Sequence, residues 1–164
     1  MTHRIVAMAE EHIEGFRAAL DSVARERRYL AMLEAPPIEE LAKFVKESLA
    51  AGAPVMVAIA DEKLVGWCDV LRKPRPTQRH TGVLGMGVIA DYRGRGIGKA
   101  LMAAALAAAK EKRFTRIELT VRSDNPRAKK LYEQFGFVEE GLCRRHMCLD
   151  GEYTDSYLMA VLYV

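Results

Sequence analysis

The sequence predicts a mixed α/β (α+β) protein with a central sheet of about six to seven strands flanked by about four helices. Its 164 residues, 50% of them hydrophobic and 29% charged, suit one globular core. Short β-branched apolar runs alternate along the chain with segments whose apolar residues recur at helical spacing. The second half contains a strand, helix, strand order, which must be a right-handed crossover if the strands are parallel. We therefore expect residues 1–164 to form a single domain.

The first half of the chain predicts three strands and two helices. The strands are short apolar runs, and each helix carries its apolar residues on one side. Pro36 and Pro37 separate the two helices, and the segment 61–63 joins the last two strands as a hairpin. In chain order the expected elements are a strand at 5–7, helices at 11–28 and 38–51, and strands at 55–60 and 64–71.

The second half predicts four strands and two helices. A glycine-rich segment leads into a long alanine-rich helix, and the segment 123–126 supplies a cap and a first-turn proline for the next helix. Asp150-Gly151 is a tight-turn pair between the last two strands. The expected elements are strands at 81–89 and 116–121, helices at 96–112 and 126–135, and strands at 137–148 and 153–164.

The cysteines indicate neither a disulfide framework nor a metal site. Cys68, Cys143 and Cys148 are an odd set in a chain whose start shows no export signal, so we expect them to be reduced. His146 lies near two of them, but on a regular strand Cys143 would face away from His146 and Cys148. The paired spacing of a structural zinc site is also missing, and we expect no metal.

Charge and hydropathy exclude several classes of partner. The net charge of +3 is mild and its basic residues are scattered, so no nucleic acid is expected. No apolar run is long enough to span a bilayer, and the first four residues lack the apolar block of a secretory signal, which predicts a cytoplasmic protein without a membrane partner. A local surplus at Arg93, Arg95 and Lys99 would suit one polyanionic ligand.

The segment 88–101 carries the most functional information. It places Gly94, Gly96 and Gly98 between a strand and a long helix. Glycines there let backbone N–H groups approach a ligand closely, with the positive end of the helix behind them. The segment therefore predicts an anion-binding loop.

Two nucleotide-binding motifs fail at this loop. A Walker loop needs a glycine where Arg93 stands and a hydroxyl residue where Ala100 stands. A dinucleotide fingerprint needs a third glycine where Lys99 or Leu101 stands. A plain glycine-rich helix start remains an alternative, although three glycines with three cations exceed what a helix start requires.

The loop resembles the pyrophosphate-binding signature of the GNAT superfamily of acetyltransferases, which is glutamine or arginine, two residues, glycine, one residue, then glycine or alanine. Arg93, Gly96 and Gly98 match it. A second stretch resembles the helix that follows in that family; its matching residues are Asn125, Ala128, Leu131, Tyr132, Phe135, Gly136 and Phe137.

The resemblance implies a fold and a co-substrate. The GNAT fold has a splayed central pair of parallel strands, here 81–89 and 116–121, with the acyl-pantetheine arm of acetyl-CoA in the gap between them. The residues it implies for acetyl-CoA binding are Met86, Gly87, Val88, Arg93, Gly94, Arg95, Gly96, Ile97, Gly98, Lys99, Asn125 and Tyr132.

The resemblance also implies two catalytic roles in direct acetyl transfer to an amine. The backbone N–H of Val88 matches the donor that stabilises the oxygen of the thioester carbonyl as charge develops there. Tyr132 matches the proton donor to the departing thiolate. The alternative for Tyr132 is an ordinary helix tyrosine packed near Phe135.

The general base is left open by the sequence. Some relatives that acetylate protein N-termini carry a glutamate where Thr120 stands, and Glu118 would point to the same face two residues earlier. We take Glu118 as the candidate base. Asp69, His80 and Glu34 are further candidates, and a chain of water molecules could replace all of them.

The acceptor is expected to be the primary amine of a small molecule. The segment 151–159 resembles GNAT members that acetylate amino acids, phosphinothricin-type herbicides or polyamines. The candidate walls of the acceptor pocket are Arg28, Tyr29, Leu30, Glu34 and Trp67, with a place in the core as the alternative for Trp67 and Leu30. A protein N-terminal or lysine acetyltransferase, or a CoA sensor without turnover, are the other hypotheses.

GNAT proteins are often homodimers, and the apolar segment 157–164 could be the contact surface.

Overall fold

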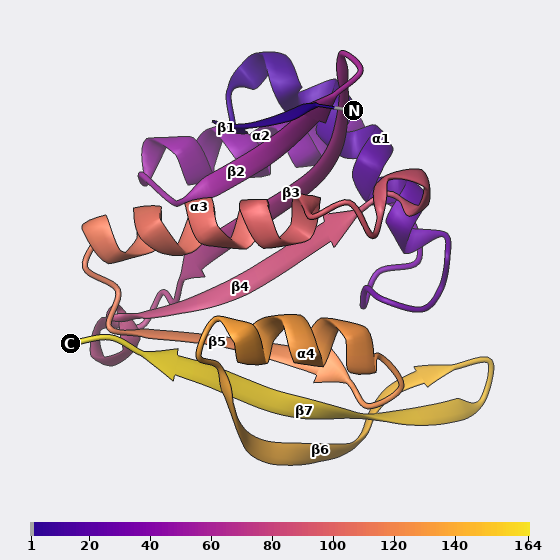
Figure 1. The fold of residues 1–164 in the computed structure, drawn as a ribbon, viewed down its shortest axis with the longest axis vertical. Helices are drawn as coiled ribbons and strands as arrows, with labels where there is room; N and C mark the ends of the chain where they lie inside the picture. Colours follow the sequence, from indigo (N-terminus) through magenta and orange to yellow (C-terminus); the bar gives the residue numbers. More distant parts are fainter. Residues whose placement is uncertain (1) are drawn as a thin grey trace.

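All seven strands pair into one sheet in the computed structural model, which describes residues 2–164 (Figure 1). The strand order is β1-β2-β3-β4-β5-β7-β6. The strands are β1 (His3–Ala7), β2 (Val55–Ala60), β3 (Lys63–Arg72), β4 (Thr81–Val88), β5 (Arg116–Arg122), β6 (Val138–Leu149) and β7 (Glu152–Leu162). The helices are α1 (Ile13–Ala24), α2 (Ile38–Ala50), α3 (Ile97–Glu111) and α4 (Pro126–Gln134), with short 3-10 helices η1 (Glu10–His12), η2 (Pro76–Gln78) and η3 (Ala90–Tyr92).

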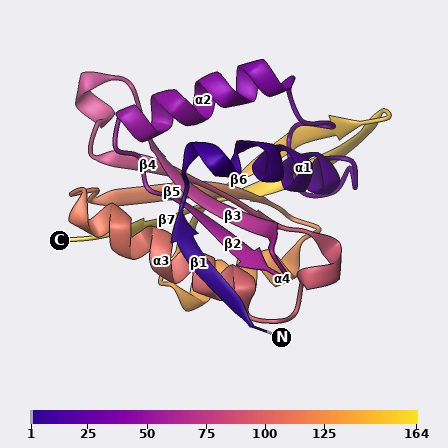
Figure 2. The same ribbon diagram turned by 90° about the horizontal axis from the view of Figure 1, so that it is seen from above.

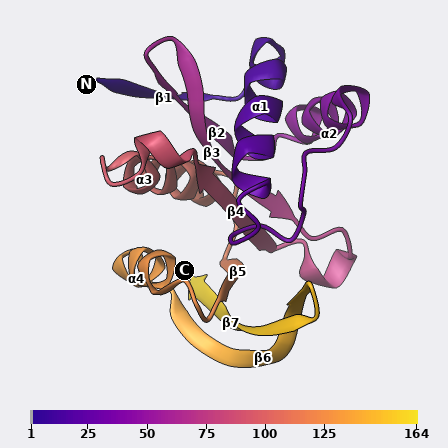
Figure 3. The ribbon, with the colours of Figure 1, turned by 90° about the vertical axis from the view of Figure 1, so that its right-hand side faces the viewer.

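Helices cover both faces of the sheet. Figures 2 and 3 show α1 and α2 on one side and α3 and α4 on the other. On the α1 side, Trp67 packs edge-on against Phe16 with 5.7 Å between ring centroids. On the α3 side, Leu101 and Ala105 are fully buried, and the small side chains of α3 let the helix lie close to the sheet.

The central strands β4 and β5 are parallel and then separate. Their register runs only from Thr81 opposite Arg116 to Val83 opposite Glu118. Every other neighbouring pair of strands is antiparallel, and β7 pairs with β5 along its whole length. The predicted mixed fold with a splayed parallel pair is confirmed.

Two local predictions were wrong. The first helix ends at Ala24 instead of reaching residue 28, because Arg27 has φ +58 and the carboxylate of Asp21 accepts a hydrogen bond from the backbone N–H of Ala35, which turns the chain back. The strand β6 is also irregular, with a register shift after Cys143 and a φ of +51 at Arg145. The argument that Cys143 faces away from His146 and Cys148 assumed strict alternation across 143–148, and this alternation does not hold.

The close contact of β4 with α3's side of the core leaves no room at Gly82. A Cβ there would lie 2.3 Å from Val70 Cγ1 and 3.0 Å from the ring of Phe114. We expect Gly82→Ala to lower the free energy of unfolding by about 1–3 kcal/mol through overpacking, measured by urea denaturation. Gly141→Ala is the matched control, because a Cβ at Gly141 meets no atom within 4 Å. Equal midpoints for the two variants would contradict this expectation.

Candidate active site

A cavity of about 650 Å³ opens where β4 and β5 separate. Residues of α1 and the segment after it, β4, the glycine loop, β5 and α4 form its wall. Most of the residues expected at the site line it: Tyr29, Met86, Gly87, Val88, Arg93, Gly94, Gly96, Ile97, Gly98, Lys99, Asn125 and Tyr132.

The glycine loop has the backbone geometry of an anion site. Gly94 and Gly96 have φ of +76 and +81, a region that favours glycine, and Gly96 is the N-cap residue of α3. No side chain caps this helix end, so the backbone N–H groups of its first turn face the cavity together with the positive end of the helix dipole. Lys99 on the same wall adds a positive charge.

The guanidinium of Arg93 forms its hydrogen bonds with other residues of the protein. Its Nε donates to the carbonyl oxygen of Val88 at 2.8 Å, and its two terminal nitrogens donate to Glu26 at 2.8 and 2.6 Å. The guanidinium also lies 4.7 Å from the ring centroid of Tyr29. The hydrogen bonds to Glu26 raise the pKa of Arg93. Arg93 therefore ties the glycine loop to the end of β4 and to the segment after α1.

The hydrogen-bond alternation of β4 fixes which amides face the gap. The N–H of Ile89 donates to the carbonyl of Val65 on β3 at 2.9 Å. Because antiparallel strands alternate between bonded and non-bonded pairs, Gly87 also bonds to β3, whereas the N–H and C=O of Met86 and Val88 point away from β3. The N–H of Val88 thus points into the gap between β4 and β5.

The same alternation applies to β5. The N–H of Ser123 donates to the carbonyl of Asp155 on β7 at 2.9 Å. The backbone groups of Thr120 and Arg122 therefore point toward β4, and both residues line the cavity. The two separated strands present polar backbone edges to each other across a space that a ligand could fill.

Tyr132 reaches the cavity from α4. The helix begins at Asn125, whose side-chain oxygen accepts a hydrogen bond from the N–H of Ala128 at 3.2 Å, and Pro126 follows in its first turn. Tyr132 is 9% exposed, and burial together with nearby Cys68 raises the pKa of its phenol. The phenol is therefore protonated at neutral pH.

Glu118 lies outside the cavity. It stands opposite Val83 in the last row where β4 and β5 still pair, so it faces the closed end of the gap. It forms ion pairs with Lys73 and with Arg116, the latter at 2.9 Å. Burial opposes ionisation, but the hydrogen bonds from Lys73 and Arg116 outweigh it and lower the pKa of Glu118. A carboxylate held by two cations is a weak proton acceptor.

Two expected acceptor residues and one cofactor residue also lie outside the cavity wall. Trp67 is 3% exposed and belongs to the core beside Phe16. Glu34 is exposed and lies 3.3 Å from Arg25. Arg95 lies over the ring of Tyr92, 5.1 Å from its centroid.

Sequence reasoning missed several cations on the cavity wall. Arg122, Arg127 and Lys130 line the cavity, and none was expected at the site. Arg127 and Lys130 are three residues apart on α4, which puts them on one side of that helix. The three-residue spacing of these two cations, shortly after Asn125, is the sequence signal that could have identified them.

Asp69 is a partly buried carboxylate on β3. Burial raises its pKa to about 7. Within residues 2–164, its side chain forms neither a hydrogen bond nor an ion pair.

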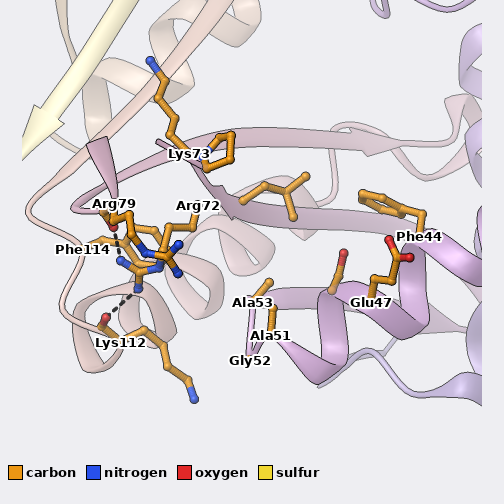
Figure 4. A pocket seen from close by; sticks show the side chains of 13 residues that line it. Phe44, Glu47, Ala51, Gly52, Ala53, Arg72, Lys73, Arg79, Lys112 and Phe114 are labelled. Carbon is orange, nitrogen blue, oxygen red and sulfur yellow. Dashed lines mark hydrogen bonds between the residues drawn. The ribbon is translucent and has the colours of Figure 1, made fainter. Parts of the chain in front are cut away.

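A second hollow of about 380 Å³ lies between α2, the end of β3 with the segment that follows it, and the segment after α3. Arg72 donates to the backbone carbonyls of Arg79 and Lys112 and stacks on Phe114. Figure 4 shows Lys73 and Lys112 pointing away from each other and from the hollow. Its cations do not converge, and we assign it no ligand.

Residues 2–164 contain neither a membrane-spanning helix nor a metal-binding cluster of side chains. No helix there is both long and apolar enough to cross a membrane. No group of three or more His, Cys, Asp or Glu side chains in this part of the chain is arranged to hold a metal ion.

The chain matches known acetyltransferases. The model of the acetyltransferase (GNAT) family matches residues 6–137. The L-amino acid N-acetyltransferase AaaT of Escherichia coli is 36% identical over 110 residues, which cover 66% of this chain and 68% of that protein. The N-alpha-acetyltransferase of Sulfurisphaera tokodaii is 35% identical over 150 residues, 86% of each chain.

Solved structures share the fold. A GNAT acetyltransferase from Streptococcus pneumoniae has a TM-score of 0.92 at 25% identity and covers 99% of this chain and 100% of its own. A phosphinothricin acetyltransferase from Sinorhizobium meliloti, solved with acetyl-CoA, also has a TM-score of 0.92, at 18% identity, over 99% of this chain and 89% of its own. The splayed sheet, the glycine loop and the family match together define an acyltransferase. The chain belongs to the GNAT acetyltransferase family and is an acetyl-CoA-dependent N-acetyltransferase.

The raised pKa of Asp69 predicts a pH-dependent stability. An aspartate in an unfolded chain has a pKa of about 3.9, so the folded protein holds this proton more tightly, and the contribution of Asp69 to stability falls as the pH rises from about 4 through 7. The side chain of the Asp69→Asn variant does not ionise, so the variant does not lose stability at this position as the pH rises. We expect the Tm of the variant to exceed the wild-type Tm at about pH 8 and the excess to shrink toward about pH 5. Thermal unfolding followed by circular dichroism checks this, and a Tm difference that stays constant with pH would contradict it.

Proposed function

We propose that the enzyme transfers the acetyl group of acetyl-CoA to the primary amine of a free amino acid or of a small molecule that resembles one. The observation that carries this proposal is a positive charge on the acceptor side of the cavity. Arg28 follows α1 and lines the cavity from the α1 face of the sheet. An α-carboxylate is the group that an amino acid would offer to a guanidinium in this position.

The neighbours of Arg28 support this role. Arg122 on the same cavity wall is already bound to Asp124, with hydrogen bonds of 3.0 and 2.8 Å. These bonds lower the pKa of Asp124, and the charge of Arg28 nearby lowers it further. Arg28 itself forms no salt bridge in the described part of the chain and lies 5.8 Å from the ring of Tyr29. Its guanidinium can therefore take a carboxylate from a ligand.

In the proposed binding mode, the glycine loop holds the diphosphate of acetyl-CoA. Backbone N–H groups from Gly94 to Lys99 would donate to the phosphate oxygens, and the dipole of α3 would add to the attraction. The backbone edges of Met86 and Val88 would pair with the amides of the pantetheine arm, which would satisfy polar groups that β5 leaves open.

In the proposed chemistry, two groups of the chain act on the thioester. The N–H of Val88 would donate to the carbonyl oxygen as negative charge develops, and one such donor can contribute about 3 kcal/mol to the transition state. Tyr132, protonated because its site is buried, would donate its proton to the departing sulfur.

A second candidate function is acetylation of a protein N-terminus. It is favoured by the similarity to the Sulfurisphaera N-alpha-acetyltransferase along 86% of the chain and to the N-alpha-acetyltransferase RimI of Mycobacterium tuberculosis, 38% identical over 96 residues, 58% of each chain. A peptide has no carboxylate next to its reacting amine. A role for Arg28 would therefore separate the two candidates.

We expect Arg28→Gln to reduce kcat/KM for the preferred amino acid about 10- to 100-fold, the value of a charge-assisted hydrogen bond, with KM for acetyl-CoA unchanged. Thiol release with a panel of amino acids, polyamines and N-terminal peptides measures this. The matched control is the amide of the same amino acid. It lacks the carboxylate, so the variant's kcat/KM for it should fall only slightly. Equal reductions of kcat/KM for the acid and for the amide would contradict a role of Arg28 in binding the carboxylate. A preference of the wild type for peptides would support the second function.

We expect Tyr132→Phe to lower kcat about 100-fold or more while the Kd for CoA stays nearly constant, because the hydroxyl takes part in proton transfer and not in holding the cofactor. Stopped-flow thiol release and calorimetry measure the two quantities. Gly96→Asp is the contrasting variant, because its carboxylate would repel the diphosphate and abolish calorimetric binding. Full turnover in Tyr132→Phe would show that the proton comes from another donor.

We also propose that the protein forms a homodimer through the exposed apolar surface of β6 and β7, where Leu162 is 68% and Val138 61% exposed. Sedimentation equilibrium at micromolar concentration should give twice the mass of one chain. A mass of one chain would exclude this assembly.

A further inference from the structure

Asp69 lies in the same row of the sheet as a residue of the cavity wall. Asp69 stands opposite Gly85 in the antiparallel register of β3 and β4. The parallel register that sets Val83 opposite Glu118 puts Gly85 level with Thr120, two residues further along both strands. Thr120 lines the cavity. Asp69, Gly85 and Thr120 therefore form one line across three strands, at the point where β4 and β5 begin to separate.

The three residues also share one face of the sheet. Trp67 contacts Phe16 of α1, and side chains two residues apart on a strand point to the same side, so Asp69 faces the α1 layer. Glu118 lies on this face as well, because it stands opposite Val83, which pairs with Leu71 on the Trp67 side of β3. The alternation along β5 then puts Thr120 there too. Arg28, the residue proposed to bind the acceptor, approaches from this side.

Neither Asp69 nor Gly85 belongs to the cavity wall, and Gly85 has no side chain to stand between that carboxylate and Thr120. A Cβ built on Gly85 would lie 3.4 Å from Oδ1 and 3.7 Å from Oδ2 of Asp69. The carboxylate thus lies over the position where β4 lacks a side chain. A water molecule above Gly85 could contact both the carboxylate and a group held in the cavity.

The packing of the core does not account for this carboxylate. The buried side chains of α1 and α2, which cover this face, are all apolar. The nearest charged rows hold Lys73, Arg116 and Glu118, which are bound to one another. A partly buried carboxylate without a hydrogen bond costs free energy that an alanine would not, so a functional role is the better explanation.

We infer that Asp69 is the general base of the reaction and receives the proton of the acceptor ammonium through one water molecule above Gly85. This inference rests on the amine acetylation described above. The ammonium R–NH3+ gives one proton through the water to the carboxylate and becomes a neutral amine. The amine nitrogen forms a bond to the thioester carbon, and the bond from that carbon to sulfur breaks.

The remaining protons balance in the same sequence. Tyr132 gives its phenolic proton to the thiolate, and the nitrogen of the intermediate loses its second proton to the phenolate. Asp69 then releases the first proton to solvent. The products are the acetamide, CoA thiol and one proton. A base with a pKa of about 7 is well matched to this task, because half of it is ionised at neutral pH.

The other candidates lie in worse places. His80 is exposed and precedes β4, at the end opposite to the gap beside Val88. Glu34 is exposed and lies next to Arg25. Glu118 is held by Lys73 and Arg116.

The test is Asp69→Asn, which keeps the volume and removes the basicity. It uses whichever amine the wild type acetylates best, amino acid or peptide, so that a wrong acceptor class leaves this test intact. We expect kcat at about pH 7 to fall 100-fold or more, with KM for acetyl-CoA and the calorimetric Kd of CoA unchanged. In the wild type, kcat should rise with pH and level off above about pH 7. In the variant this limb should disappear, and the rate should instead keep rising toward the pKa of the free amine.

Asp150→Asn, at the exposed turn between β6 and β7, is the matched control and should keep the wild-type rate and pH profile. Circular dichroism at each pH confirms that both variants are folded. If folded Asp69→Asn keeps the wild-type kcat and the same acidic limb, Asp69 is not the base. A reduced kcat with an unchanged pH profile would equally overturn the inference, because a residue that only shapes the site would give that result.

Discussion

The site depends on the separation of two parallel strands that a sheet would ordinarily keep paired. β4 and β5 are bonded only as far as Val83 and Glu118. Beyond that row, β3 holds one edge of β4, and β7 holds one edge of β5 along its length, so each strand stays extended although their facing edges are apart. The facing backbone groups would be costly to bury without partners, and a ligand with its own amides can supply them.

The closed end of the gap is held by charges. Arg116 bonds Glu118 on its own strand and Glu140 of β6, with terminal nitrogen to oxygen distances of 3.0 and 2.6 Å for Glu140. Lys73, directly after β3, joins the same group. This network crosses from the segment after β3 to β6 just below the row where pairing stops, and Glu118 is its central anion. At the open end Arg93 plays the comparable part, because it joins the glycine loop, the end of β4 and Glu26.

Local features of the fold and site were readable from the sequence, and long-range ones were not. The seven strands and four helices were expected because periodicity, caps and turn residues are local. Gly96, Asn125 and Tyr132, which line the cavity, were candidates because their motifs are contiguous. The partner of Arg93 lies 67 residues away in the chain, so no local pattern could reveal it. The choice between Glu118 and Asp69 depends on the register of β3, β4 and β5, and alternation within one strand says nothing about register.

The contact between Trp67 and Gly87 gives the molecule a built-in optical probe. A Cβ on Gly87 would lie 2.3 Å from the indole ring, so the ring rests directly on the backbone that forms one wall of the cavity. Trp67 is the sole tryptophan of the chain. Its fluorescence originates from one known place, and any ligand that shifts β4 at Gly87 changes the surroundings of that single fluorophore without a label being attached.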